Sequence, residues 1–382
     1  QDKPNETEKK KLINKKNYFL ISDPKEIDNW VKEAEETGEV AVDTETSSLN
    51  PHEADLIGVS LSPKIGRACY IPIGHSSNKC ISKEVVLKKL KPLLEDPSIK
   101  KIGQNIKFDF IVLFKNGIKI SPMEDTMLMS YVLDAGKNRH NMDTLSEIHL
   151  NHKTIAFKDL VGTGKKEISF KDVSLEKAKD YAAEDADITF RLFKKFYKDL
   201  KTEKMINIYE LFEKPMVEIL ATMEIKGIKI DSKFLKVLST TFGKKIDKVQ
   251  EEIFKISKKE FNIASPKQLG EVLFDEMKLV EKPRKTATGQ YRTDEQTLTS
   301  LAVSHPFVAD ILSYREAAKL KSTYIDRLPA WVAAKDGRVH TQFHQLVAAT
   351  GRLASSDPNM QNIPVRTELG REIRTAFVPR GR

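Results

Sequence analysis

Three short acidic segments stand out because their residue types could hold metal ions. The first is the run EVAVDTET at residues 39–46, in which Asp43 and Glu45 follow a short apolar stretch. The apolar stretch predicts a buried strand, and residues two apart in a strand project from the same face. Two hard oxygen ligands would therefore share one side of that strand.

Two later segments could add further carboxylates. Asp109 follows the sequence KIGQN at residues 101–105, which is typical of a strand leading into a helix, and lies in the first turns of an apolar helix that ends near Asn116. Tyr181 and Asp185 lie in a segment with helical composition, and their i, i+4 spacing places them on one helix face. We expect the fold to gather the four carboxylates.

Such a set of ligands indicates phosphodiester hydrolysis. Carboxylates suit Mg²⁺ or Mn²⁺, and two such ions roughly 4 Å apart can stabilise both the attacking and the leaving oxygen of a displacement at phosphorus. Four acids at one place would repel one another without cations. Tyr181, with an ordinary pKa near 10, would be a poor base at neutral pH, so its expected role is to position the attacking water.

Each segment alone is more often a solvated strand edge, a helix cap or a chance spacing, and only the ordered set is specific. Further acids near these motifs, at Asp125, Asp134, Glu184 and Asp187, are expected to be caps or solvated carboxylates. The histidines show no metal-site spacing and are expected to be structural or at the surface: His75, His140, His152, His340 and His344.

The first half of the chain resembles the DEDD exonucleases of the tyrosine-bearing subtype. It is most similar to the proofreading domain of the bacterial DNA polymerase I family. The segments that carry this resemblance are VDTETSSL at 42–49, GQNIKFD at 103–109, DTMLMSYVLD at 125–134 and YAAEDAD at 181–187.

The second half resembles the thumb and the first palm segment of family A DNA polymerases. The segments are SPKQLG at 265–270, KLKSTY at 319–324 and TGRLASSDPNMQNIPVR at 350–366. The resemblance runs from about residue 17 to the C-terminus. The family's 5′-nuclease domain would precede this chain and its polymerase aspartates would follow, so we expect these residues alone not to extend a primer.

The resemblance implies an α/β ribonuclease H-like exonuclease domain, with a mixed sheet flanked by helices, followed by a mainly helical thumb and the first strands of a palm. The implied boundaries are 1–16 for a linker remnant, 17–202 for the exonuclease, 203–335 for the thumb and 336–382 for the palm. The patterns predict strands at 18–21, 40–42, 56–62, 68–72 and 337–343, and long helices at 209–227 and 232–261.

The resemblance also implies roles for single residues. Asp43, Glu45 and Asp185 would hold the ion that activates water, and Asp43 with Asp109 the ion at the leaving 3′ oxygen. Tyr181 and Glu45 would orient the nucleophile. Asn105 would steady the DNA strand, and Leu49 would wedge against a terminal base, although an apolar residue after a strand is more often part of a core.

DNA contacts are implied in the second half. Lys319, Ser322 and Thr323 would hold backbone phosphates. The residues expected to line the primer-template minor groove are Arg352, Asn359, Gln361, Asn362 and Arg366. For Arg352 the alternative is a structural salt bridge or a turn. The basic loop at 282–285 is expected to be solvated, with contact to duplex phosphates as a second interpretation.

Composition is compatible with this interpretation. The chain has 382 residues, 40% of them hydrophobic and 31% charged, with a formal net charge of +9, which suits a polyanionic partner such as DNA. Cys69 and Cys80 have no partner at zinc-site spacing and indicate a reducing compartment. We expect a cytoplasmic, nucleoid-associated monomer without a membrane segment.

Two other function classes remain open from the sequence. A free-standing exoribonuclease of the RNase D kind would use the same acids, but helical nucleic-acid-binding repeats would follow it in place of the sequence at 350–366. A catalytically silent module that only grips DNA would have lost one or more of the acids, and none is lost here.

Overall fold

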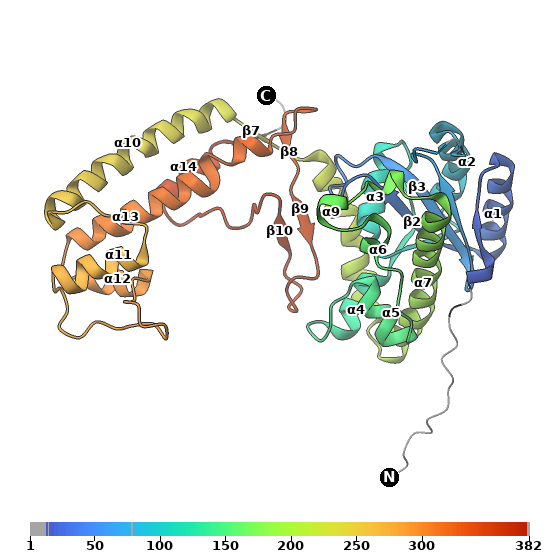
Figure 1. The fold of residues 1–382 in the computed structure, drawn as a ribbon, viewed down its shortest axis with the longest axis horizontal. Helices are drawn as coiled ribbons and strands as arrows, with labels where there is room; N and C mark the ends of the chain where they lie inside the picture. The colour runs from blue at the N-terminus through green and yellow to red at the C-terminus, as the bar shows by residue number, and fades with distance from the viewer. Residues whose placement is uncertain (1–12, 14, 78, 380–382) are drawn as a thin grey trace, which may run out of the picture. The chain divides into compact units, whose positions relative to one another are not determined.

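The computed structural model describes residues 13, 15–77 and 79–379, and the chain forms two compact units (Figure 1). Unit 1 comprises Gln1–Lys226 and Phe343–Ala354, and unit 2 comprises Gly227–Gln342 and Ser355–Arg382. Most of the expected linker remnant at 1–16 lies outside the described residues. No helix in the part of the chain that the structure describes combines the length and apolarity needed to cross a bilayer.

Unit 1 is built on a mixed six-stranded sheet with the strand order β1-β4-β3-β2-β5-β6. The strands β2, β3 and β4 are antiparallel neighbours, whereas β1 runs parallel to β4, and β5 runs parallel to both β2 and β6. Their bounds are β1 Tyr18–Leu20, β2 Glu39–Thr46, β3 Leu56–Lys64, β4 Arg67–Pro72, β5 Lys100–Gly103 and β6 Met123–Asp125. The predicted mixed sheet is confirmed.

Helices cover the sheet, and Figure 1 shows it between α7 and the pair formed by α1 and α2. The α-helices are α1 Pro24–Thr37, α2 Lys83–Glu95, α3 Ile106–Lys115, α4 Thr126–Asp134, α5 Met142–Leu150, α6 Phe157–Val161, α7 Leu175–Thr202, α8 Ile206–Ile208 and α9 Lys214–Lys226. Short 3₁₀ turns occur at Lys15–Asn17, Gly164–Lys166 and Phe170–Asp172, and a π-helical turn at Tyr209–Glu213. The long helix α7 contacts strands β1 to β5 and so spans the sheet.

Local sequence explains why these elements begin and end where they do. Pro24 starts α1 behind the cap Asp23, whose carboxylate accepts a hydrogen bond from the Lys25 amide, and Gly38 ends the helix at φ 71°. The strand β3 is buried along almost its whole length, as expected for a central strand with both faces covered.

A later stretch, Phe343–Ala354, belongs to unit 1. The Phe343 amide donates to Glu224 Oε1 at 2.7 Å, and the Gln345 side-chain amide donates to Glu213 Oε2 at 2.7 Å. The Tyr131 hydroxyl donates to the Ala348 carbonyl at 2.6 Å. Lys107 on α3 bonds both Glu224 and the Phe343 carbonyl. This returning segment therefore completes the fold of unit 1.

Unit 2 is mainly helical. Its elements are β7 Ile228–Ile230, α10 Ser232–Ser257, α11 Pro266–Gly270, a π-helical turn at Glu271–Glu276, α12 Glu295–Ala302, α13 Phe307–Leu320, a π-helical turn at Lys321–Ile325, a 3₁₀ turn at Leu328–Trp331, β8 Arg338–Val339, α14 Glu368–Arg374 and β11 Phe377–Val378. The strands β11, β7 and β8 form a small antiparallel sheet. The chain crosses between the units in β9 Gln342–His344 and β10 Ala354–Ser356.

Three sequence-based expectations need correction. The single strand expected at 337–343 is interrupted at residues 340–341, between β8, which pairs with β7, and β9, which pairs with β10. The helix expected over 232–261 ends at Ser257, since Lys258 adopts a left-handed conformation at φ 55°. The helix expected over 209–227 begins as a π-helical turn before α9.

Candidate active site

Three carboxylates from β2 and α7 meet at one place in unit 1. Asp43 and Glu45 project from β2, a central strand, and Asp185 comes from α7, which packs across that strand. One oxygen of each carboxylate lies within 4.8 Å of the other two. The i, i+2 spacing on the strand produces the shared side, and the packing of α7 supplies the third acid.

Asp109, the fourth expected carboxylate, lies beside this group and not within it. It sits in the first turn of α3 and is 3% exposed. Its Oδ1 accepts from the Thr44 amide at 2.9 Å and from the Thr44 hydroxyl at 2.6 Å. Burial, and then the negative charge of Asp43, raise the pKa of Asp109, so the two carboxylates act on each other electrostatically.

The electrostatics of the group favour a cation. Burial raises the pKa of Asp43 to about 6. Burial, and then repulsion from Asp43, raise the pKa values of Glu45, Asp109 and Asp185 well above their ordinary range. Among the described residues no donor reaches the buried Oε1 of Glu45. Hard oxygen ligands, mutual repulsion and an unsatisfied buried oxygen together fit a divalent cation of the Mg²⁺ or Mn²⁺ type.

Tyr181 lies one turn before Asp185 on α7, and the two side chains act on each other electrostatically. Burial and the neighbouring carboxylates raise the pKa of this phenol above its already high ordinary value, which removes any role as a base near neutral pH. The ring contacts two other rings, with centroids 6.0 Å from that of Phe157 and 6.1 Å from that of Phe170.

Two further predicted residues follow the ends of strands of the unit 1 sheet. Leu49 follows β2 and is 93% exposed, so it is not part of the core. Asn105 precedes α3 in a left-handed conformation at φ 64°, and its side chain is exposed. Both are accessible to a ligand.

The acids expected to be caps or solvated surface have structural partners, although several are buried. Asp125 accepts from the amides of Met127 and Leu128, which caps α4, and from those of Asn105 and Ile106 at the start of α3. Asp134 pairs with Lys137 at the end of α4. Glu184 and Asp187 are fully buried, which the prediction of solvated carboxylates missed.

The expected DNA contacts are exposed polar side chains in both units. Lys319, Ser322 and Thr323 lie at the junction between α13 and the following π-helical turn of unit 2. Arg352 is exposed in the returning segment of unit 1. The remaining predicted contacts are exposed in unit 2: Asn359, Gln361, Asn362 and Arg366. Asn359 Oδ1 accepts from the amides of Gln361 and Asn362, which orders that loop.

Sequence reasoning missed Thr44, Phe157 and Phe170. Thr44 lies between the two acids of β2. The hypothesis that four carboxylates converge already placed Asp109 near β2, and this could have suggested a contact between Thr44 and Asp109. The two phenylalanines are far from Tyr181 in sequence, and no local spacing indicates that their rings pack against it.

Comparison with known proteins agrees with this arrangement. The profile of DNA polymerase family A matches residues 232–382, and a profile described as 3′-5′ exonuclease matches residues 18–201. The DNA polymerase I of Pseudomonas aeruginosa is 43% identical over 375 residues, which cover 95% of this chain and 41% of that protein. The DNA polymerase I of Rhizobium leguminosarum is 42% identical over 383 residues, covering 94% of this chain and 38% of that protein.

A solved structure is also similar across most of the chain. The POL domain of Pol1 from M. smegmatis, determined in complex with DNA primer-template and dNTP, matches with a TM-score of 0.80 and 30% sequence identity, over 94% of this chain and 58% of that one. The chain spans about two fifths of the length of the curated relatives. Because the two profiles match in succession and these relatives match across both, the chain belongs to the family A DNA polymerases of the bacterial DNA polymerase I group.

Proposed function

We propose that this chain is the proofreading part of a DNA polymerase I, which removes nucleotides from the 3′ end of DNA and releases 5′-mononucleotides. The observation that carries the proposal is the meeting of Asp43, Glu45 and Asp185, with Asp109 beside them, in a unit whose sequence matches a 3′-5′ exonuclease profile. The names of the relatives support DNA as the substrate.

Two divalent ions, Mg²⁺ or Mn²⁺, would be held by these carboxylates. Asp43, Glu45 and Asp185 would hold one, and Asp43 with Asp109 the other. When bound, such ions lower the pKa of a water and stabilise charge on the leaving oxygen. The raised pKa values of the acids and the unsatisfied Glu45 oxygen support this assignment, because both are relieved by a cation.

The surrounding residues would position the substrate. Tyr181 would orient the attacking water through its hydroxyl, together with Glu45. Asn105 would steady the terminal strand, and the exposed Leu49 would pack against its last base.

The returning segment and unit 2 would grip primer-template DNA. Exposed Lys319, Ser322 and Thr323 would contact phosphates. Arg352 would reach the minor groove, whose acceptors are shared by all base pairs, and would thus report pairing without reading sequence. The minor groove would also be lined by Asn359, Gln361, Asn362 and Arg366. The similar structure that holds primer-template DNA supports this assignment.

We further propose an exonuclease domain at 17–202, a thumb at 203–335 and the start of a palm at 336–382, in a cytoplasmic, nucleoid-associated monomer. The two family profiles support this division. The alternative of a free-standing exoribonuclease is not favoured, because residues 232–382 match the polymerase family. A silent DNA-gripping module is not favoured either, since all four acids are present.

The proposal is tested by digestion of 5′-labelled single-stranded DNA in Mg²⁺ or Mn²⁺ and in chelator. Asp43→Ala should reduce the rate by several orders of magnitude, because it removes a ligand common to both ions. Tyr181→Phe should cost less, about 10- to 100-fold, since one hydrogen bond to a charged group is lost.

A suitable control is Glu36→Ala, which removes an exposed carboxylate from α1 in the same unit. It should leave the rate unchanged. Digestion that persists in chelator, or an Asp43→Ala variant as active as the Glu36→Ala variant, would place the reaction elsewhere.

A further inference from the structure

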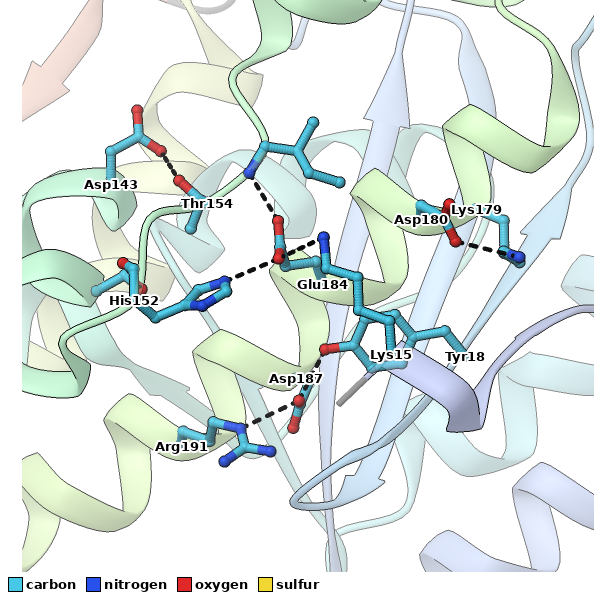
Figure 2. A network of polar contacts seen from close by, with 12 residues as sticks. Lys15, Tyr18, Asp143, His152, Thr154, Lys179, Asp180, Glu184, Asp187 and Arg191 are labelled. Atoms are coloured by element: carbon cyan, nitrogen blue, oxygen red, sulfur yellow. Dashed lines mark hydrogen bonds and ion pairs between the residues drawn. The ribbon is translucent and has the colours of Figure 1, made fainter. Parts of the chain in front are cut away.

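Glu184 is a fully buried carboxylate on α7, next to Asp185 in sequence, whose partners all lie outside that helix. Its Oε2 accepts from the Ile155 amide at 2.7 Å. Its Oε1 lies 2.8 Å from His152 Nε2 and 2.9 Å from Lys15 Nζ (Figure 2). Both oxygens are therefore occupied in holding other segments against α7.

The segment that Glu184 holds is also tied on its other side. The Thr154 hydroxyl donates to Asp143 Oδ1 of α5 at 2.5 Å, as Figure 2 shows. Residues 152–155 are thus fixed between α5 and α7. The next element is α6, which begins at Phe157, two residues after Ile155, whose amide donates to Glu184.

Phe157 links the segment held by Glu184 to Tyr181. Its ring stacks on Phe170 with centroids 5.9 Å apart and an interplanar angle of 16°, and both rings contact Tyr181. Phe157 is 46% exposed, so burial alone does not fix its position. The position of the ring depends on the segment that precedes it, which Glu184 and Asp143 hold.

We propose that Glu184 is a positioning residue, which through His152 and the Ile155 amide fixes the segment leading to Phe157 and so holds the Tyr181 ring with its hydroxyl toward Asp185. The inference rests on the proposed function, in which that hydroxyl orients the attacking water. Because Tyr181 and Glu184 are three residues apart on one helix, one overlying segment can reach both.

Asp187 provides a matched control on the same helix. It is equally buried, and its carboxylate accepts from the Tyr18 hydroxyl at 2.8 Å and from Arg191 Nε at 3.1 Å (Figure 2). It also accepts from the Gly66 amide at 2.7 Å. The Tyr18 and Gly66 contacts tie α7 to β1 and to the turn between β3 and β4, whereas Arg191 lies on α7 itself, and none of the three belongs to the segment that carries Phe157.

The experiment compares Glu184→Ala with Glu184→Gln and Asp187→Ala in the whole chain, using metal-dependent digestion of single-stranded DNA. Glu184→Ala should lower kcat by about 10-fold or more with a smaller change in KM, because the misplaced Tyr181 hydroxyl would act in the hydrolysis step and not in DNA binding. Glu184→Gln keeps an acceptor for the Ile155 amide and should restore most of kcat. Asp187→Ala should lower the melting temperature and leave kcat within about 3-fold of wild type.

A double-mutant cycle with Tyr181→Phe identifies the route. If Glu184 acts by placing the tyrosine hydroxyl, its contacts no longer matter once that hydroxyl is removed. In the Tyr181→Phe background, Glu184→Ala should therefore lower kcat by less than about 3-fold. Equal losses in both backgrounds would overturn the proposal, as would wild-type kcat in folded Glu184→Ala.

A readout without metal or substrate separates this inference from the proposed function. NMR of ring-labelled tyrosine in metal-free protein should show the Tyr181 ring resonances moved and averaged by Glu184→Ala, and unchanged by Asp187→Ala. If the wild-type chain digests no DNA, the proposed function fails, and this spectrum still decides the positioning role. If Glu184→Ala does not fold, His152→Ala takes its place in both measurements. The proposal is then overturned if the losses of kcat from His152→Ala and Tyr181→Phe are additive, or if the Tyr181 resonances do not move.

Discussion

The metal-free acidic group should make unit 1 less stable as the pH rises. The pKa of Asp43 is raised by burial from its ordinary value of 3.8 to about 6. Between these two values the folded chain keeps a proton that the unfolded chain has already released. The stabilisation is therefore complete below about pH 4 and is lost as the pH rises through about 6.

The size of the effect follows from the same shift. Moving one carboxyl from 3.8 to about 6 corresponds to roughly 3 kcal/mol, at about 1.4 kcal/mol for each pH unit. Glu45, Asp109 and Asp185 are raised in the same direction, so the loss should continue above pH 6. A divalent cation should reverse it, because it compensates the charges that burial disfavours.

The assay needs a probe that reports on unit 1 alone. The chain has two tryptophans: Trp30 is buried in α1 of unit 1, and Trp331 lies in unit 2. In a Trp331→Phe background, denaturant unfolding followed by Trp30 fluorescence gives the free energy of unfolding of unit 1 in chelator at pH 4 to 8. The same series in Asp43→Asn removes the titration of Asp43 and also its repulsion of Glu45, Asp109 and Asp185, so the variant should lose less stability than wild type as the pH rises.

The free energy of unfolding of wild type minus that of Asp43→Asn should fall by at least roughly 3 kcal/mol as the pH rises from 4 to 7. Mg²⁺ added at pH 7 should raise the unfolding midpoint of wild type more than that of Asp43→Asn. Parallel pH profiles for the two chains, or a wild-type advantage that grows with pH in chelator, would refute the reasoning.

Three further predictions follow from single contacts. Asp125→Ala should cost roughly 2–4 kcal/mol of unfolding free energy, because four amides lose their acceptor, whereas Asp23→Ala, which frees one exposed amide, should cost about 1 kcal/mol; equal costs in denaturant titrations would contradict this. Gly58→Ala should lower the melting temperature, since its Cβ would lie 2.2 Å from the Tyr70 hydroxyl, and an unchanged melting curve would show that the ring moves freely. Lys319→Ala should reduce the slope of log affinity for duplex DNA against log salt concentration by the amount expected for about one phosphate contact. The slope is measured by titration at several salt concentrations, and identical slopes for wild type and variant would exclude a phosphate contact by Lys319.

The sequence predicts the sheet of unit 1 well because local patterns determine it. Apolar runs predicted β2, β3 and β4 to within a few residues, and the two-residue spacing of Asp43 and Glu45 placed them on one side of β2. The i, i+4 spacing likewise predicted that Tyr181 and Asp185 would share a face of α7. The family resemblance, confirmed by the profiles, gave the order of the domains.

Features that depend on distant partners were not predictable. Glu184 looks like an ordinary helical acid, and its burial is explained by contacts with Lys15, His152 and Ile155, which lie about thirty or more residues away in sequence. The π-helical turn at Tyr209–Glu213 has no sequence period of its own, so a continuous helix was expected. The break in the strand at 337–343 lies where the chain changes its pairing partner from β7 to β10, and no local pattern indicates that change.

The returning segment Phe343–Ala354 gives unit 1 a fold that is discontinuous along the chain. During synthesis, residues up to Lys226 leave the ribosome well before the segment that bonds Glu213, Glu224 and Tyr131, so the unit can complete its fold only after more than a hundred further residues. The segment also matches the polymerase profile, not the exonuclease profile. A substitution at Gln345 would thus alter a residue inherited with the polymerase and weaken the unit that carries the exonuclease acids.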